Sequence, residues 1–380
     1  MGLSTSRSVV YDVDVHNSWS SDEELAAYLP RAARERFATA WGRRLPAPAA
    51  LTYSRPGGTT DRLDAAPPEG GRAGSRYGTL AAQLLDPHGI DRALLTFNPG
   101  SDGARHDAEL AIDVCRAAND WLIDRWLDGG DPRLYGVLML PTATPDAAAA
   151  EIRRAGGHPR IAGALMVANP LNRPFGHPVY RPIIEAVAEL DLTLVAHIGG
   201  DLRSHGTAFA SALPTTRADA FALVDQPAVH HLTSLIVSGV FEEHPRLRLL
   251  FNECGYTWLP HVFWSLDAQH AALRAERPRL RRAPSDYLRE HVWLSSQPFD
   301  SAAGAKKVLG LLGAFGGMED RLCFASDYPH HDSESPSQVA SRLPRSWRDG
   351  VLAGNAARAL RWPVEKTIVE RPAAARPVEV

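Results

Sequence analysis

Short apolar runs alternate along the chain with longer segments in which apolar residues recur at helical spacing. A run such as 322–325 is apolar on both faces, which is typical of a parallel strand covered by helices. The pattern therefore predicts an α/β protein in which strands and helices alternate. The expected strands are 9–16, 93–98, 134–140, 161–168, 192–197, 247–252, 292–296 and 322–325. The expected helices are 22–41, 79–85, 108–127, 146–155, 180–190, one ending at 240, 258–275 and 306–312.

Polar side chains stand where several of these strands end: Asp14 and His16, His197, Glu253, and Asp327. Eight strands with intervening helices fit a closed (β/α)₈ TIM barrel, whose active groups come from the carboxyl ends of the strands. Asp14 and His16 are two residues apart, so a strand points both to one face. Imidazole and carboxylate ligands together suit a divalent ion such as zinc or manganese.

Each of these signals also has a purely structural explanation. Asp14 and His16 could face the surface, His197 could be a hydrogen-bonded core histidine, and Asp327 could cap the next turn. A doubly wound open sheet is the alternative fold, but no glycine-rich phosphate loop follows the first strand. Because the polar groups end separate strands, we favour a barrel with a metal site at its mouth.

Two long insertions interrupt the alternation, after the first strand (about 19–78) and after the fifth (about 201–227). Both are irregular, and proline and glycine are frequent in the first. Loops of this length on a barrel are usually functional, so we expect them to cover the site or contact a partner subunit, although a loop without a role is the alternative. The sequence thus predicts one barrel domain over 1–363 and an extended tail over 364–380, with the tail docking on a second subunit of a homodimer.

Composition narrows the class of protein. The chain has 380 residues, 44% of them hydrophobic, and a formal net charge of -3, with arginines scattered among acids. This balance argues against nucleic-acid binding. The sequence lacks a signal peptide pattern and any run of about eighteen apolar residues, so we expect a cytoplasmic protein without a membrane span. Cys115, Cys254 and Cys323 are isolated in apolar contexts, as reduced core thiols would be.

The chain resembles the amidohydrolase-related family that includes aminocarboxymuconate semialdehyde decarboxylase and the aromatic-acid decarboxylases, a branch of the metal-dependent amidohydrolase superfamily. The resemblance covers most of the chain, and its fragments follow the family's order. These fragments are Asp12–His16, the strand ending in His197, Ser238–Pro245, Glu253–Pro260, Pro284–His291, Ser326–His330 and Gly354–Arg358.

The resemblance implies a metal held by Asp14, His16, His197 and Asp327, with zinc the expected ion and manganese the alternative. It implies that Asp327 and Glu253 are the catalytic groups. The sequence departs from the family pattern at two positions, because Asp14 and Glu253 stand where many members have a histidine.

The resemblance also implies that His330 orients Asp327 from behind. Apart from the resemblance, Arg203, Tyr328 and Trp258 are the candidates for contacting substrate, Arg203 through a carboxylate. The alternatives are an ordinary surface arginine for Arg203 and a core residue for Trp258.

The same ligands serve several reactions, so the activity stays open. We expect a metal-dependent hydrolase that uses metal-activated water on a small carboxylated or aromatic metabolite, because the histidine that decarboxylases would use is absent. The alternative is a non-oxidative decarboxylase of an aromatic or unsaturated acid. A barrel that has lost catalysis and serves as a binding protein is a further alternative, which the substituted Asp14 and Glu253 favour.

Overall fold

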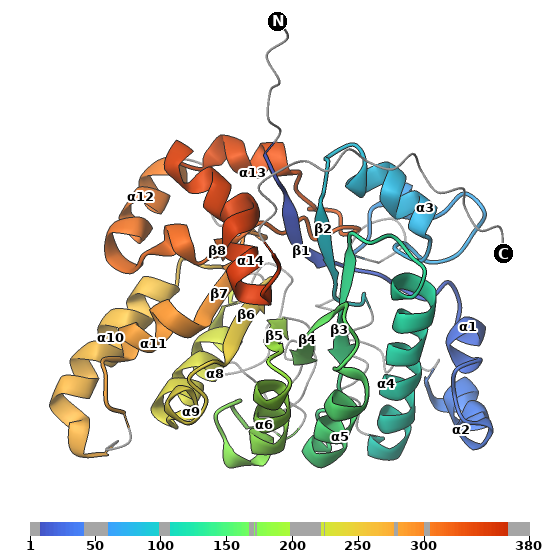
Figure 1. Ribbon diagram of the computed structural model, residues 1–380, viewed down its shortest axis with the longest axis horizontal. Coiled ribbons are helices and arrows are strands. Elements are labelled where there is room, and N and C mark those ends of the chain that lie inside the picture. The colour runs from blue at the N-terminus through green and yellow to red at the C-terminus, as the bar shows by residue number, and fades with distance from the viewer. Residues whose placement is uncertain are drawn as a thin grey trace, which may run out of the picture.

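The chain folds into eight parallel strands wrapped by helices (Figure 1), as the alternating pattern predicts. The structure is a computed structural model and describes residues 8–41, 60–98, 107–166, 171, 173–197, 222–223, 225–276, 280–299 and 305–363. The strands are β1 Tyr11–Val15, β2 Arg92–Leu95, β3 Leu134–Met139, β4 Ile161–Met166, β5 Thr193–His197, β6 Arg248–Asn252, β7 Val292–Ser295 and β8 Leu322–Cys323.

Helices lie outside this ring of strands (Figure 1), so the predicted (β/α)₈ barrel is confirmed. They are α1 Asp22–Ala26, α2 Arg31–Arg36, α3 Tyr77–Leu80, α4 Ala108–Leu122, α5 Pro145–Ala155, α6 Arg181–Glu189, α8 Gln226–Val237, α9 Val240–Glu243, α10 Leu259–Leu273, α11 Pro284–His291, α12 Ala305–Gly316, α13 Pro336–Arg342 and α14 Asn355–Leu360.

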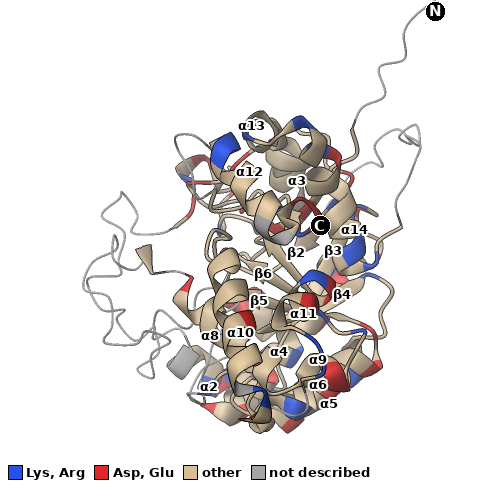
Figure 2. Cartoon of the chain, turned by 90° about the vertical axis from the view of Figure 1, so that its left-hand side faces the viewer, with Lys and Arg blue, Asp and Glu red and all other residues tan. Residues whose placement is uncertain are grey.

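Each strand is bonded to the next in sequence order, from β1 to β8. Nearly all strand residues are buried, because side chains on one face fill the barrel and those on the other meet the helices. Many charged residues lie on the surrounding helices and loops, where acidic and basic residues are interspersed (Figure 2). Among the described helices, none combines the length and apolar character needed to cross a membrane.

Backbone hydrogen bonds between β1 and the chain that follows β8 close the barrel. Val13 N–H donates to the Phe324 carbonyl (3.0 Å), Asp327 N–H to that of Asp14 (3.1 Å), and His16 N–H to that of Tyr328 (2.7 Å). We call this ladder the closing seam. It joins the segment that carries Asp14 and His16 directly to the segment that carries Asp327.

The helix expected over 22–41 is interrupted. The structure has α1, then α2, then a π-helical turn over Phe37–Trp41. Pro30 sits at the N-cap of α2, and a proline at that point lacks the N–H that would continue the preceding helix. The amphipathic spacing of the segment is thus correct for helix, while the proline divides it.

The first insertion returns to the barrel beside the closing seam. Asp61 pairs with His330 in an antiparallel bridge. On either side of this bridge, Arg62 N–H donates to the Pro329 carbonyl (2.9 Å) and His331 N–H to that of Thr60 (2.9 Å). The insertion is therefore anchored on the loop that follows Asp327. Residues 201–221 of the second insertion and the tail 364–380 lie outside the described residues.

Gly74 packs directly against the backbone of His16, the residue after β1. It has φ +74°, and a Cβ built there would lie 2.3 Å from the His16 carbonyl oxygen. Gly70 also has a left-handed backbone (φ +92°), but a Cβ there meets nothing within 4 Å.

We expect Gly74→Ala to destabilise the fold more than its matched control Gly70→Ala. Both substitutions carry the cost of a left-handed alanine, about 1–2 kcal/mol. Gly74→Ala adds a steric cost of about 1–3 kcal/mol, because the backbone of His16 must move. Urea denaturation of the two variants measures the difference, and equal free energies of unfolding would contradict the predicted contact.

Candidate metal centre

Six metal-binding side chains gather at the carboxyl end of the barrel. Asp14, His16 and His197 form one group, and His16, Glu253, Asp327 and His330 form another, with the donor atoms in each group lying within 4.8 Å of one another. The sequence predicted this convergence from strand ends for all of these residues except His330, which the family resemblance added. His16 belongs to both groups.

Asp14 is fully buried on β1 and faces the last residue of β5. Its Oδ2 lies 3.3 Å from His197 Nε2, and its Oδ1 lies 3.8 Å from His16 Nε2. A third contact comes from β2, because the Thr96 hydroxyl donates to Asp14 Oδ1 (2.6 Å). The acid that replaces a histidine in this family motif thus lies within the group rather than on the surface.

Asp327 lies between two imidazoles. Its Oδ1 is 2.9 Å from His16 Nε2 and 2.7 Å from His330 Nδ1. The two imidazole rings lie against each other with their centroids 4.4 Å apart. The structure therefore brings His330 against Asp327, which is the contact that its expected orienting role requires.

Glu253 directly follows β6 and lies nearer the open end of the barrel. Its Oε2 is 3.7 Å from His197 Nε2, and its side chain is 19% exposed. The side chains of Asp14 (1%) and Asp327 (0%) are sealed from solvent. Of these carboxylates, Glu253 is thus the one with a path to solvent.

Three residues at the barrel mouth adopt a left-handed backbone that non-glycine residues rarely take: Phe97, Glu253 and Asp327, with φ of 61°, 57° and 58°. Such backbones are strained and persist where surrounding contacts hold them. At Glu253 the holding contact is Ser295, whose hydroxyl oxygen accepts the Glu253 N–H (3.0 Å) and whose hydroxyl donates to the Gln297 carbonyl (2.8 Å).

The pKa values of the three carboxyl groups shift in different directions, because burial raises each of them and the neighbouring imidazoles lower them. Burial and the nearby charge of Asp327 raise the pKa of Glu253 to about 7. Burial alone would also raise the pKa of Asp327, but His330 and His16 outweigh it and lower that pKa. Burial would raise the pKa of Asp14 as well, but His197 and His16 outweigh it, so this pKa is also lowered.

The pKa of His16 is raised to about 10, because Asp14 and Asp327 outweigh the effect of burial. The pKa of His197 is raised in the same way, by Asp14 against burial. The site thus draws positive charge toward its carboxylates. A divalent cation would meet the same demand, and the ring nitrogens that held it would have to be deprotonated.

The donor set fits a divalent ion. Asp14 Oδ2 and Asp327 Oδ2 are buried, and neither accepts a hydrogen bond from any residue that the structure describes. Buried carboxylate oxygens without donors are costly unless a cation or water occupies the space between them. Together with neutral imidazole nitrogens they form the mixed oxygen and nitrogen environment of divalent transition metals.

The predicted substrate contacts are placed differently. The Tyr328 hydroxyl donates to Gln83 Oε1 (2.9 Å), so it ties the loop after β8 to the first insertion. Trp258 Nε1 donates to the Cys254 and Gly255 carbonyls, and its ring packs on Phe251. Both side chains are buried, and their contact with substrate stays a prediction. Arg203 lies outside the described residues.

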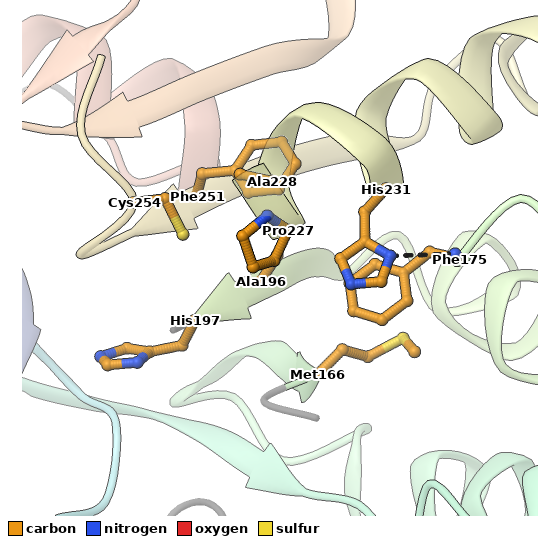
Figure 3. A pocket seen from close by; sticks show the side chains of 9 residues that line it. All are labelled: Met166, Phe175, Ala196, His197, Pro227, Ala228, His231, Phe251 and Cys254. Atoms are coloured by element: carbon orange, nitrogen blue, oxygen red, sulfur yellow. Dashed lines mark hydrogen bonds between the residues drawn. The ribbon is translucent and has the colours of Figure 1, made fainter. Parts of the chain in front are cut away.

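A small pocket adjoins His197 at the ends of β5 and β6 and the first turn of α8 (Figure 3). Its lining is mostly apolar, and His231 closes one side by stacking on Phe175 and accepting the Phe175 N–H (3.3 Å). Figure 3 shows the His197 imidazole directed away from Met166 and Phe175. The pocket therefore places apolar groups beside His197.

The sequence analysis missed Thr96 and Ser295, which touch the predicted ligands and catalytic group. Both stand at the carboxyl ends of strands, so the same strand-end rule could have found them. Asp12 was noted only as part of a motif. Its buried carboxylate accepts the N–H groups of Ser326 (2.9 Å) and Asp14 (3.2 Å), so it supports both sides of the closing seam.

A barrel with imidazole and carboxylate donors at its carboxyl-end mouth defines a class of metal-dependent barrel enzymes. Within that class the chain belongs to the amidohydrolase family, whose model matches residues 11–362. The family predicted from the sequence motifs is thus confirmed.

Three similar proteins are decarboxylases of aromatic acids. γ-Resorcylate decarboxylase from a Rhizobium species is 28% identical over 281 residues, covering 72% of this chain and 83% of that protein. The crystal structure of 5-carboxyvanillate decarboxylase from Sphingomonas paucimobilis matches with a TM-score of 0.64 and 21% identity, covering 93% of this chain and 99% of that one. Dihydroxybenzoic acid decarboxylase from a Polaromonas species matches with a TM-score of 0.61 and 20% identity over 93% and 97% of the two chains, and its structure holds manganese and the inhibitor 2-nitroresorcinol.

Our expectation of a hydrolase is wrong. The similar proteins break a carbon–carbon bond and release carbon dioxide, which their names as decarboxylases state. The expectation rested on Glu253 standing in place of a histidine, yet the same metal ligands serve both reactions and cannot distinguish them. Zinc as the expected ion also gains no support, because the solved relative holds manganese.

We predict that His197→Ala and Asp14→Ala each lose the bound divalent ion. The wild-type protein should hold about one manganese per chain, and removal of a direct ligand should weaken binding by more than the roughly 100-fold seen for outer contacts. Elemental analysis after dialysis measures the ion. His244→Ala, which removes a partly buried histidine at the end of α9, is the control and should keep the ion. Retention of manganese by Asp14→Ala would remove Asp14 from the ligand set.

Proposed function

We propose that the protein is a manganese-dependent, non-oxidative decarboxylase of an aromatic carboxylic acid that carries a ring hydroxyl group. The observation that carries this proposal is the gathering of Asp14, His16, His197 and Asp327 at the mouth of a barrel that belongs to this family. The similarity to γ-resorcylate decarboxylase over 72% of the chain supports the choice of reaction.

The reaction replaces the carboxylate by a proton. The ring carbon takes up a proton, the bond to the carboxylate breaks, its electron pair returns to the ring, and carbon dioxide leaves. A ring hydroxyl assists, because it donates electron density to the carbon being protonated. Asp14, His16, His197 and Asp327 would hold the ion. Bound manganese supplies positive charge that stabilises the negative charge of the substrate oxygens.

Glu253 is the proposed proton donor. It is the carboxylic side chain of the site that reaches solvent, so water can return its proton after each turnover. Asp14 and Asp327 are sealed and paired with imidazoles, which suits them to hold a cation rather than to exchange protons. The Ser295 contact fixes the Glu253 backbone and thereby its distance from the ligands.

The proposed reaction makes a direct prediction about products. The manganese-loaded protein should convert γ-resorcylate, 5-carboxyvanillate or another hydroxylated benzoate to the corresponding phenol and carbon dioxide. In D₂O the phenol should carry deuterium at the carbon that lost the carboxylate, because the proton comes from solvent through the enzyme. Chromatography, gas analysis and mass spectrometry measure these products. Protein stripped of metal is the control, and failure of fully loaded protein on a panel of hydroxylated aromatic acids would overturn the proposal.

We expect Glu253→Gln to lose activity while it keeps its manganese. Glutamine has the size of glutamate but cannot donate an acidic proton, so kcat should fall by about 10²–10⁴-fold. Steady-state kinetics and elemental analysis on the same sample separate the two effects. Glu253→Asp keeps the acid and should recover part of the activity. Wild-type kcat in Glu253→Gln would assign the proton to another group.

A further inference from the structure

Thr96 lies between two of the proposed ligands. It follows β2 directly, is buried, and donates its backbone N–H to the Val15 carbonyl (2.9 Å). Its hydroxyl oxygen is 2.6 Å from Asp14 Oδ1 and 3.2 Å from His16 Nδ1. One hydroxyl group therefore touches both ligands that β1 contributes.

The positions of the protons follow from what each group can donate. The hydroxyl has a single proton, and an ionised carboxylate can only accept, so the short contact places that proton on the bond to Asp14. The hydroxyl lone pairs are then left for His16, whose Nδ1 must donate.

The Phe97 carbonyl reinforces this assignment. It lies 3.4 Å from His16 Nδ1, and a carbonyl can only accept. The left-handed backbone of Phe97 is the local strain that directs its carbonyl to the ring. Nε2 lies 2.9 Å from Asp327 Oδ1 and donates to that carboxylate. An ion bound at Nε2 would replace this proton, while Nδ1 would keep its own.

The contact also distinguishes the two oxygens of Asp14. Oδ1 is engaged by Thr96, while buried Oδ2 accepts no hydrogen bond from the described residues and lies 3.3 Å from His197 Nε2. Only one oxygen of the carboxylate is thus left for a cation.

We infer that Thr96 is a positioning residue of the metal centre. Its hydroxyl group leaves only Oδ2 of Asp14 and Nε2 of His16 available to bind the ion. The inference rests on the metal centre of the proposed function. It explains how an acid works at a position where the family motif often has histidine, because the threonine hydroxyl occupies the second oxygen and holds the carboxylate to a single donor atom. Outer contacts of this kind orient the ligands and tune the affinity for the ion.

A purely structural role is the competing explanation, because the Thr96 hydroxyl is also 3.4 Å from the Val15 carbonyl. A structural role would change stability alone. A positioning role changes the affinity for the ion and the symmetry of its surroundings, and the electron paramagnetic resonance spectrum of Mn²⁺ reports that symmetry.

The test compares Thr96→Val, which keeps the shape and removes the hydroxyl, with Thr96→Ser, which restores the hydroxyl. Mn²⁺ affinity is measured by titration of the full-length protein, and the Mn²⁺ spectrum is recorded at saturation. Thr96→Val should bind Mn²⁺ about 10- to 100-fold more weakly and with an altered spectrum, and Thr96→Ser should return both to near the wild-type values. Thr96→Ala should show the same loss as Thr96→Val and serves if the valine variant does not fold.

Thr193→Val is the matched control. Thr193 is likewise a buried barrel threonine, and its hydroxyl donates to the Ala359 carbonyl (2.7 Å), away from the ligands. Wild-type Mn²⁺ affinity and spectrum in Thr96→Val and Thr96→Ala would overturn the inference, as would an equal loss of affinity in Thr193→Val. A wild-type protein that binds no Mn²⁺ would instead overturn the metal centre and with it the proposed function.

Discussion

The closing seam between β1 and the chain after β8 is the constraint on which the site depends. Its hydrogen bonds alternate between the two segments through Val13, Asp14 and His16 on one side and Phe324, Asp327 and Tyr328 on the other. A barrel must close to satisfy its edge strands, so the backbone itself brings the first and last of the proposed ligands together. The buried Asp12 carboxylate supports this seam by accepting backbone N–H groups from both sides.

The same closure concentrates negative charge. Asp12, Asp14 and Asp327 are buried within a few residues of the seam, and Glu253 joins them from β6. Two responses to this charge are visible. Burial raises the pKa of Asp12 to about 7, so that acid tends toward its neutral form. The pKa of Glu253 is raised in the same way, whereas the charges of Asp14 and Asp327 are balanced by the neighbouring imidazoles of His16, His197 and His330. The electrostatics of the mouth are therefore set by the fold before any ion binds.

Much of this arrangement could be predicted from the sequence, because it depends on local patterns. Apolar runs fixed the strands, and the residues at which they stop identified His197, Glu253 and Asp327. The spacing of Asp14 and His16 placed them on one face. Thr96 and Ser295 also stand at strand ends, but their roles depend on contacts with other strands, which the local pattern does not reveal; the contact of the Tyr328 hydroxyl with Gln83 is of the same kind. The type of reaction could not be predicted from the sequence pattern either, since the proposed metal ligands suit hydrolysis and decarboxylation equally.

The anchor at Asp61 and His330 has a consequence for how such a protein can diversify. The first insertion leaves β1 and returns to a fixed backbone register on the loop that follows Asp327. Because Thr60 and Arg62 are held by main-chain bonds, substitutions of the side chains in this part of the insertion can change the surface beside His330 while the backbone register is kept. The surface of the barrel mouth can therefore acquire new substrate preferences during evolution while the proposed metal ligands beneath it stay in place.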